Sequence, residues 1–410
     1  MAMWQIVVAI ILCGIVVFAK IGAIYQVFFA LTYIFLCKKR QFSQTPTHFF
    51  AILIPAHNEE AGLREVLERC ESLDYPREMF SVAVIADNCD DNTAKIAREC
   101  GAKCLERFDT EQRGKGEALE WAIPQVLADH RPDAIMILDA DCFLDPQALK
   151  ACDFELAKGN QALQVSYLVS NSDDSFRCYA MGLARFIENQ LFYWPKSKLG
   201  LSIALLGTGM VFHREVFAKC PWRVGGLTED YEYGLDLMRN NIKPVFVGDV
   251  GLVSPFPIET KQLETQRSRW MAGVLQGIRK TFVPLLWRGI CKGDLVAFDA
   301  AVSMLYVSRP LVLCQVFFAG IAAILAWILL PVFWGRVILV AWLATLVLYF
   351  AYFMIGVLGM GLTRQRAKYL LMIPVFVLKY MLLAAKSILF RRPKEWKRTP
   401  RNTDGNDLQE

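Results

Sequence analysis

Long apolar stretches at both ends of the chain constrain its fold more than any other feature. Residues 4–37 form one such stretch and three more follow Ser303, whereas residues 41–300 have the composition of a soluble domain. Stretches of this length and polarity are typical of membrane-spanning helices. The sequence therefore predicts a globular domain that lies between N-terminal and C-terminal membrane segments.

The N-terminal stretch, within residues 1–40, is longer than one upright crossing requires. As a helix it would span about 50 Å, against a hydrocarbon core about 30 Å thick. Because it contains little turn chemistry, we favour one long tilted helix, with two short helices as the alternative. No small-residue cleavage site follows it, so we interpret it as an uncleaved membrane anchor.

Two further crossings are predicted within residues 301–362, at 303–330 and 337–360, with a turn at 331–336 between them. Residues 363–398 contain another apolar segment, which carries two lysines and has basic clusters on both sides. The positive-inside rule disfavours a full crossing here, so we expect a re-entrant or interfacial helix. Residues 399–410 are polar and are predicted to be disordered.

The basic residues gather beside the apolar stretches, at 38–40, 364–368 and 391–398. Such clusters follow the positive-inside rule and attract anionic lipid, so the predicted partner is a lipid bilayer and not a nucleic acid. They predict an integral membrane protein, of the bacterial inner membrane, with a cytoplasmic globular domain. The twelve cysteines lack metal-binding spacing and are interpreted as reduced thiols.

Strand-like runs alternate with helical patterns in the globular part, residues 41–258. The runs "FFAILIPA", "FSVAVIAD" and "AIMILDAD" are each followed by a helical pattern. This alternation predicts an α/β domain with a mostly parallel sheet, which binds ligands beyond the carboxyl ends of its strands. Polar residues end all three runs, at 57–59, 87–88 and 139–141, and should line one edge of the sheet.

Asp139 and Asp141 are the candidate metal ligands. They stand two residues apart where a buried strand should end, and extended geometry would bring both carboxylates to one face. Like charges so placed repel, and a divalent cation with a preference for hard oxygen ligands, Mg²⁺ or Mn²⁺, would remove that conflict. The alternative is a turn followed by a helix start, because the same segment contains turn residues and Pro146.

Two further segments favour binding of a nucleotide. Asp87 comes first after its strand and could accept from an N–H of a nucleobase, while its Asp and Asn neighbours cap the next helix. Lys115 stands between two glycines at a helix start, where an ammonium and free backbone N–H groups favour phosphate. A solvated lysine in a turn is the alternative for Lys115.

Residues 259–300 read as amphipathic helices at the membrane interface, and they include "QRSRW". Arg269 beside Trp270 pairs a phosphate-binding fork with an aromatic plane for a sugar ring. Upstream, Glu229 and Asp230 follow Thr228, a good helix N-cap. The helix dipole there should lower the pKa of Asp230 and keep its carboxylate ionised.

The motifs together resemble those of a known family. "ILIPAHNEE", "ADNCDD", "RGKGEAL", "LDAD", "GTGM", "TED" and "QRSRW" occur here in the order found in membrane-bound family 2 glycosyltransferases. That group includes cellulose, chitin and hyaluronan synthases and bacterial exopolysaccharide glycosyltransferases. The resemblance spans residues 49–290 and implies a GT-A fold, a UDP-sugar donor and an inverting reaction, as a hexosyl- or N-acetylhexosaminyltransferase.

The resemblance also implies a role for each matching residue. Asp230 would be the general base with Glu229 in support, and Asp141, with Asp139, would hold the metal. Nucleotide-sugar binding would fall to Pro55, Asn58, Glu59, Asp87, Lys115, Asp139, Gln266 and Arg269. Acceptor binding would fall to Gly207, Thr208, Gly209 and Trp270.

The acceptor is less well specified than the donor. Because no stretch like the FxVTxK gating loop of cellulose synthases occurs and only two confident spans follow the domain, we favour transfer to a membrane-associated acceptor. That acceptor would be lipid-linked or a growing glycan, in exopolysaccharide or glycolipid assembly, and partners in polysaccharide assembly are compatible with it. A processive β-glycan synthase is the alternative. A catalytically inactive scaffold is disfavoured, because every carboxylate of the motifs is present.

Overall fold

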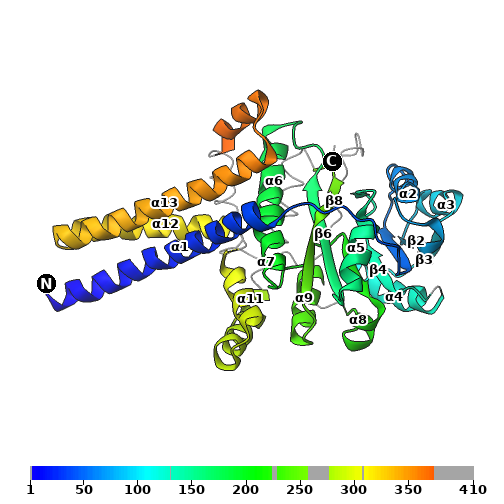
Figure 1. Ribbon diagram of the computed structural model, residues 1–410, viewed down its shortest axis with the longest axis horizontal. Helices are drawn as coiled ribbons and strands as arrows, with labels where there is room; N and C mark the ends of the chain where they lie inside the picture. Colours follow the sequence, from blue (N-terminus) through cyan, green and yellow to red (C-terminus); the bar gives the residue numbers. More distant parts are fainter. Residues whose placement is uncertain (1, 130, 224–228, 257–276, 307–308, 374–410) are drawn as a thin grey trace.

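The chain consists of a globular α/β domain and a bundle of long helices that extends from it (Figure 1). The computed structural model describes residues 2–129, 131–223, 229–256, 277–306 and 309–373. The candidate residues Gln266, Arg269 and Trp270 lie outside this part of the chain, as do Thr228 and most of the predicted segment 363–398.

Eight strands of the described residues form one sheet in the order β3-β2-β1-β4-β7-β6-β8-β5. Their bounds are β1 (Phe50–Ala56), β2 (Phe80–Asp87), β3 (Lys103–Arg107), β4 (Ala134–Ile137), β5 (Phe143–Leu144), β6 (Ala162–Val169), β7 (Met210–His213) and β8 (Pro244–Ser254). Strands β3, β2, β1 and β4 are parallel, as predicted. The other half is mixed, because β7 runs antiparallel to both β4 and β6 and β5 runs antiparallel to β8. "Mostly parallel" is therefore correct only for the first half.

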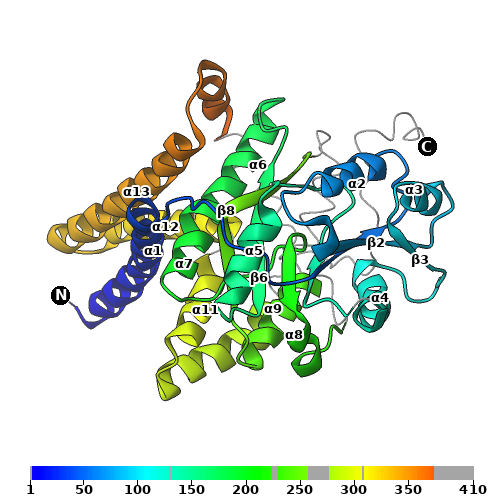
Figure 2. The same ribbon diagram turned by 45° about the vertical axis from the view of Figure 1, so that its right-hand side comes forward.

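Helices cover both faces of the sheet (Figure 2), and an apolar core fills the space between the helices and each face. One face carries α2 (Leu63–Glu71), α3 (Thr93–Glu99) and α5 (Ala148–Ala157). The other carries α4 (Lys115–Asp129), α8 (Arg214–Lys219) and α9 (Glu229–Arg239). A short 3-10 turn, η1 (Arg77–Met79), precedes β2. The β1 sequence FAILIPA is buried almost throughout, as expected for a strand with helices on both sides.

One continuous helical run separates the sheet from the membrane helices. It consists of α6 (Phe176–Phe186), the π-helix η2 (Ile187–Tyr193) and α7 (Trp194–Lys198). Asn189 of η2 accepts a hydrogen bond from the backbone N–H of Tyr167 at 2.8 Å and donates to the carbonyl of Arg185 at 2.9 Å. The first bond fastens η2 to β6 next to a register shift between Val165 and Ser166, and the second lies within the helical run.

Three helices of the described residues are long and apolar enough to cross a membrane. They are α1 (Met3–Leu36), α12 (Arg309–Leu329) and α13 (Val332–Met360). The shorter helix α11 (Leu295–Tyr306) directly precedes α12 in the chain. Buried alanines line their contacts, at Ala19, Ala319 and Ala323. Small residues of this kind let apolar helices approach closely without a hydrophobic driving force between them.

The structure agrees with the favoured single N-terminal helix and changes the predicted bounds of the later segments. The N-terminal stretch is one helix of 34 residues and not a hairpin. The predicted span 303–330 is divided between α11 and α12. The predicted turn at 331–336 is wrong, because α13 begins at Val332 directly after Pro331. A side chain at Gly335 would meet the backbone of Ala326 at 3.0 Å, so the glycine lets α12 and α13 pack together there.

Buried ion pairs join the membrane helices to the globular domain. After α1, the Arg40 guanidinium binds Asp249 of β8 and lies 2.9 Å from a carboxylate oxygen of Glu155 of α5. The Asp249 side chain is fully buried. On α7, the buried Lys196 lies 2.7 Å from Asp299 of α11, which also accepts a hydrogen bond from Tyr25 of α1 at 2.6 Å.

The far end of α13 is held to the globular domain as well. Residues 364–373 are helical as far as they are described. Arg366 lies 2.7 Å from Asp173, in the loop after β6, and donates to the carbonyl of Met360. The basic residues 364–368 therefore lie on the same side of the bundle as the globular domain, which is the arrangement that the positive-inside rule requires of an in-out-in hairpin.

Replacement of Arg40 tests how strongly the first junction holds. Arg40→Met leaves Asp249 buried without its cation, so we expect a loss of about 3 kcal/mol in unfolding free energy. The measurement is unfolding of the detergent-solubilised chain. Arg64→Met is the matched control, because Arg64 and Glu99 form an ion pair at 2.6 Å with side chains about half exposed, and solvent screens such a pair, so its loss should cost far less. Equal effects of the two substitutions would contradict a structural role for the Arg40 junction.

Candidate active site

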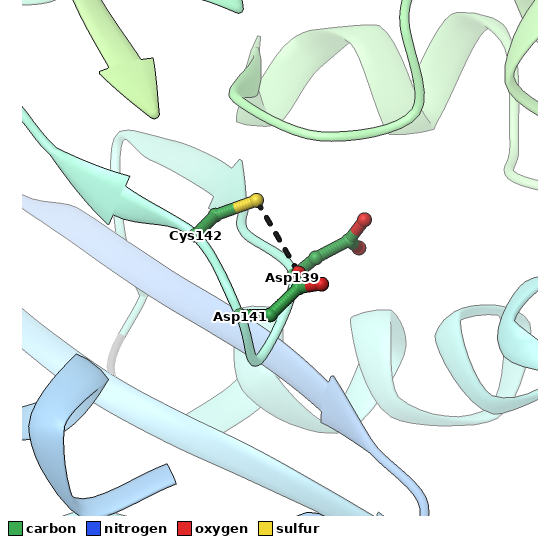
Figure 3. Close-up of side chains that lie close together, drawn as sticks. All are labelled: Asp139, Asp141 and Cys142. Atoms are coloured by element: carbon green, nitrogen blue, oxygen red, sulfur yellow. Dashed lines mark hydrogen bonds between the residues drawn. The ribbon is translucent and has the colours of Figure 1, made fainter. Parts of the chain in front are cut away.

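The two aspartates of "LDAD" meet in a tight turn after β4. Leu138 still donates to the β1 carbonyl of Leu53, and the backbone N–H of Cys142 then donates to the carbonyl of Asp139 at 3.1 Å. Ligand atoms of Asp139, Asp141 and Cys142 all lie within 4.8 Å of one another (Figure 3). The predicted meeting of carboxylates is present, but a turn produces it and not extended geometry.

The donor set fits a hard divalent cation. Burial raises the pKa of the Cys142 thiol to about 12, so this group stays protonated and is a poor ligand. Its sulfur lies 3.5 Å from an Asp141 oxygen, as the dashed line in Figure 3 shows. The two carboxylates remain, and Mg²⁺ and Mn²⁺ prefer such oxygen ligands over sulfur.

Lys115, the first residue of α4, lies at the centre of the site. Its ammonium is 2.5 Å from an Asp139 oxygen and 2.7 Å from the carbonyl oxygen of Gly207, to which it donates. Burial opposes the charge, but Asp139, Glu229 and Asp230 outweigh it and raise the pKa of Lys115. Lys115 is therefore a largely enclosed cation among carboxylates and not a solvated lysine in a turn.

The "GTG" loop connects this lysine to α9. Gly207 has a φ of +85°, and a Cβ atom there would lie 3.0 Å from a carboxylate oxygen of Asp230. Thr208 is buried, and its hydroxyl accepts a hydrogen bond from the backbone N–H of Asp139 at 3.0 Å. The N–H of Gly209 donates to the carbonyl of Ile137 at 2.8 Å. The loop thus contacts the metal candidates and the base candidate, and its role in acceptor binding stays a prediction.

Asp230 is half-buried in the first turn of α9, next to Glu229. Burial and the Glu229 carboxylate raise the pKa of Asp230 to about 7, although the N–H of Tyr231 and the Lys115 ammonium act in the opposite direction. The predicted lowering by the helix dipole is therefore wrong. Desolvation and a like charge outweigh the favourable field of a helix terminus, which typically amounts to at most about 2 kcal/mol.

The ends of β2 and β3 form a second polar cluster. The Asp87 carboxylate accepts from Arg107 at 2.7 Å and from the Asn88 amide at 3.0 Å. Arg107 also donates to the carbonyl of Gln112, in the loop that leads to Lys115. The sequence patterns did not indicate Arg107 as a partner of Asp87. The available signal was a cation at the end of the neighbouring strand β3.

Three further candidates lie in the β1 end and the loop after it. Pro55 is half-buried in β1. Asn58 has a φ of +54°, and its side-chain oxygen accepts from the backbone N–H of Asp90 at 3.0 Å. Glu59 donates its backbone N–H to the Thr93 hydroxyl at 2.8 Å. These bonds tie the loop after β1 to the loop after β2, and the nucleotide-sugar roles of all three residues remain predictions.

The site combines a mixed sheet, a turn with two aspartates at one edge, and a carboxylate on helix α9. This is the arrangement expected of a GT-A glycosyltransferase. Residues 46–273 match the glycosyltransferase-like family 2. That match covers more than half of the chain, so the protein belongs to the family 2 glycosyltransferases, a class of sugar transferases. The expected family and fold are confirmed.

Individual relatives agree with this assignment. The beta-monoglucosyldiacylglycerol synthase of Synechocystis sp. is 25% identical over 61% of this chain and 51% of its own length. Cellulose synthase 1 catalytic subunit of Komagataeibacter xylinus is 26% identical over 64% of this chain and 35% of its own length. The chain thus spans about half the length of the first curated relatives it matches, or less.

A solved structure shares the fold over almost the whole chain. It is the mannosyltransferase PcManGT from Pyrobaculum calidifontis in complex with GDP-Man and Mn²⁺, with a TM-score of 0.54 and 17% identity. The alignment covers 92% of this chain and 99% of that protein. The similarity therefore includes the long apolar helices as well as the sheet.

The raised pKa of Asp230 predicts a stability effect with a definite sign. A folded-state value near 7, against about 3.9 in the unfolded chain, gives stability that is present below pH 4 and is lost as the pH rises through 7. Asp230→Asn removes this loss, so its advantage over the natural chain should grow by about 1–3 kcal/mol from pH 5 to pH 8.

Thermal unfolding in detergent without divalent cations measures this advantage. Asp236→Asn is the control for the removal of one carboxylate from the same helix, because Asp236 is half-exposed and paired with Arg239. An Asp230→Asn advantage that is the same at pH 5 and pH 8 would contradict the raised pKa.

Proposed function

We propose that this protein is an inverting glycosyltransferase that transfers a sugar from a UDP-sugar to a membrane-associated acceptor in glycolipid or exopolysaccharide assembly. The observation that carries the proposal is the position of Lys115. It contacts Asp139 and the Gly207 carbonyl at once, and a Cβ at Gly207 would lie 3.0 Å from Asp230. The groups proposed to bind the donor and one base candidate thus lie next to one another.

Inversion requires one base and a stabilised leaving group. The acceptor hydroxyl attacks the anomeric carbon on the side opposite UDP, so one carboxylate must accept its proton. Asp230 takes that role, since its raised pKa suits proton transfer near neutral pH, and Glu229 supports it. The Lys115 ammonium and the first turn of α4 orient and bind the diphosphate.

A divalent cation, Mg²⁺ or Mn²⁺, held by Asp141 with Asp139, supplies positive charge to the diphosphate when bound. The family resemblance implies that Asp141 is the more direct ligand, and Asp139 also contacts Lys115. In the cluster at β2, Arg107 fixes the Asp87 carboxylate as an acceptor for a nucleobase N–H. Uracil presents such a donor, so the Asp87 carboxylate is compatible with a UDP-sugar.

Access to lipid follows from the helix at residues 277–292. Val283, Trp287 and Ile290 are each about two-thirds exposed and recur at helical spacing on one face. Basic residues flank them, including Arg279 and Lys280. We assign this helix to the bilayer surface, where it brings the pocket next to a lipid-bearing acceptor. The glycolipid synthase among the relatives supports an acceptor of this kind.

The test is an incubation of the purified chain with a panel of UDP-sugars and with diacylglycerol, sphingoid or polyprenyl lipids, followed by mass analysis. We expect a single sugar on one lipid class, UDP release that chelators abolish, and a loss of at least about 100-fold for Asp230→Asn. A ladder of long glycans without added lipid would favour the processive β-glycan synthase instead. Full activity of folded Asp230→Asn would refute the base assignment.

Two glycine substitutions distinguish a local effect on the candidate site from a general effect of backbone strain. Gly207→Ala places a methyl group 3.0 Å from the Asp230 carboxylate, so we expect kcat to fall by about 100-fold because the base is displaced. Gly200→Ala is the matched control. Gly200 has a similar φ of +76°, but its nearest neighbour would be the Lys243 ammonium at 3.9 Å.

Both alanine variants should therefore lose about 1 kcal/mol of stability, and only Gly207→Ala should lose turnover. Steady-state kinetics and thermal unfolding of the two proteins check this. Similar turnover in both variants would mean that Gly207 does not border the reacting groups.

A further inference from the structure

Gln164 is a polar residue in the most buried part of the sheet. It lies on β6 between β7 and β8, opposite Met210 and Phe246, and its side chain is fully buried. A buried amide without partners is costly, and apolar residues fill most of the surrounding strand positions. The function assigned to the pocket does not by itself account for an amide here.

The Gln164 amide holds the loop that precedes β7. Its nitrogen donates to the carbonyl of Thr208 at 2.7 Å and to that of Val165 at 2.9 Å, and its oxygen accepts the N–H of Leu206 at 2.8 Å. Both amide hydrogens are therefore used. Two of the three bonds end at Leu206 and Thr208, which are 42 and 44 residues away from Gln164 in the sequence.

This loop needs such a restraint. Gly207 and Gly209 both have left-handed backbone conformations, with φ of +85° and +65°, on either side of Thr208. Glycine reaches these conformations at little cost but also leaves them easily. The Gln164 amide fixes the peptide groups before and after Gly207, at Leu206 and Thr208.

The loop passes the restraint on to the reacting groups. The Thr208 hydroxyl accepts the backbone N–H of Asp139 at 3.0 Å, and the Gly207 carbonyl accepts from Lys115 at 2.7 Å. Hydrogen bonds and the covalent chain of residues 206–208 together therefore connect Gln164 to a metal-ligand candidate and to the lysine proposed to bind phosphate. Outer partners of this kind orient metal ligands, and their loss typically weakens metal binding about 10–100-fold.

We propose that Gln164 is a positioning residue that, through the loop 206–209, holds Asp139 and Lys115 in the geometry that binds a divalent cation and a diphosphate. The proposal rests on the proposed function and adds a residue that contacts neither donor nor acceptor. It also explains the "GTG" sequence: glycines allow the path, and Thr208 carries the restraint to Asp139.

The test compares two buried amides in the full-length chain in detergent. Gln164→Met keeps the volume and removes all three bonds. Asn189→Leu is the matched control, because Asn189 is equally buried and also accepts one backbone N–H and donates to one carbonyl, but its partners are in β6 and α6, away from the loop 206–209. Mn²⁺ binding is followed by electron paramagnetic resonance without any donor, and thermal unfolding is recorded in parallel.

Both variants should lose stability, whereas only Gln164→Met should raise the dissociation constant for Mn²⁺, by about 10-fold or more. An unchanged Mn²⁺ affinity in Gln164→Met, together with a stability loss like that of Asn189→Leu, would overturn the proposal and leave Gln164 a structural amide. If the natural chain itself binds no Mn²⁺, the metal site of the proposed function fails first and the positioning role fails with it.

Thr208→Val provides a second route if Gln164→Met does not fold. It removes the hydroxyl that accepts from Asp139 and leaves the Gln164 bonds to the backbone in place. We expect a similar loss of Mn²⁺ affinity, by about 10-fold.

Where both single variants fold, their effects on affinity should not add in the double variant, because the two residues act in one series. Additive losses would show that Gln164 acts by another route.

Discussion

The active-site region depends on one cation, the Lys115 ammonium. Asp139, Glu229 and Asp230 come from a strand end and a helix that are far apart in the sequence, and all three raise the pKa of this lysine. Without it, three carboxylates would approach one another in a poorly solvated pocket, where like charges repel strongly. The Lys115 ammonium thus allows the carboxylates of the sheet edge and of α9 to lie close together. In the proposed function it also supplies positive charge to the diphosphate of the donor.

The same principle operates where the globular domain meets the helical bundle. Lys196 and Asp299 are buried between α7 and α11, and Tyr25 of α1 donates to the same aspartate. Arg40 repeats this arrangement in the segment after α1. Buried ion pairs contribute little net stability compared with apolar packing, but they are costly to break and so fix one relative arrangement. Polar contacts thereby specify how an apolar bundle and an α/β domain are joined.

Local patterns in the sequence were sufficient for the elements and for most of the candidate site. Alternating runs predicted β1, β2 and β4, and the residues that end them do lie at one edge, because parallel strands bring their carboxyl ends together. Features that depend on distant partners were missed. Arg107 and Gln164 acquire their roles from residues 20 and 44 positions away, and β7 joins the sheet antiparallel only after the chain has reversed. The pKa of Asp230 was predicted with the wrong sign because burial, its largest cause, is a property of the folded chain.

The three junctions at Arg40, Lys196 and Arg366 have a geometric consequence for the acceptor. They hold α1, α11 and the end of α13 against the globular domain, so the distance between the Asp230 carboxylate and the membrane helices is fixed by the fold. An acceptor embedded in the bilayer can then present its hydroxyl only if its head group has the matching height. Under the proposed function, the fold therefore sets how far from the membrane helices an acceptor hydroxyl must lie to reach Asp230.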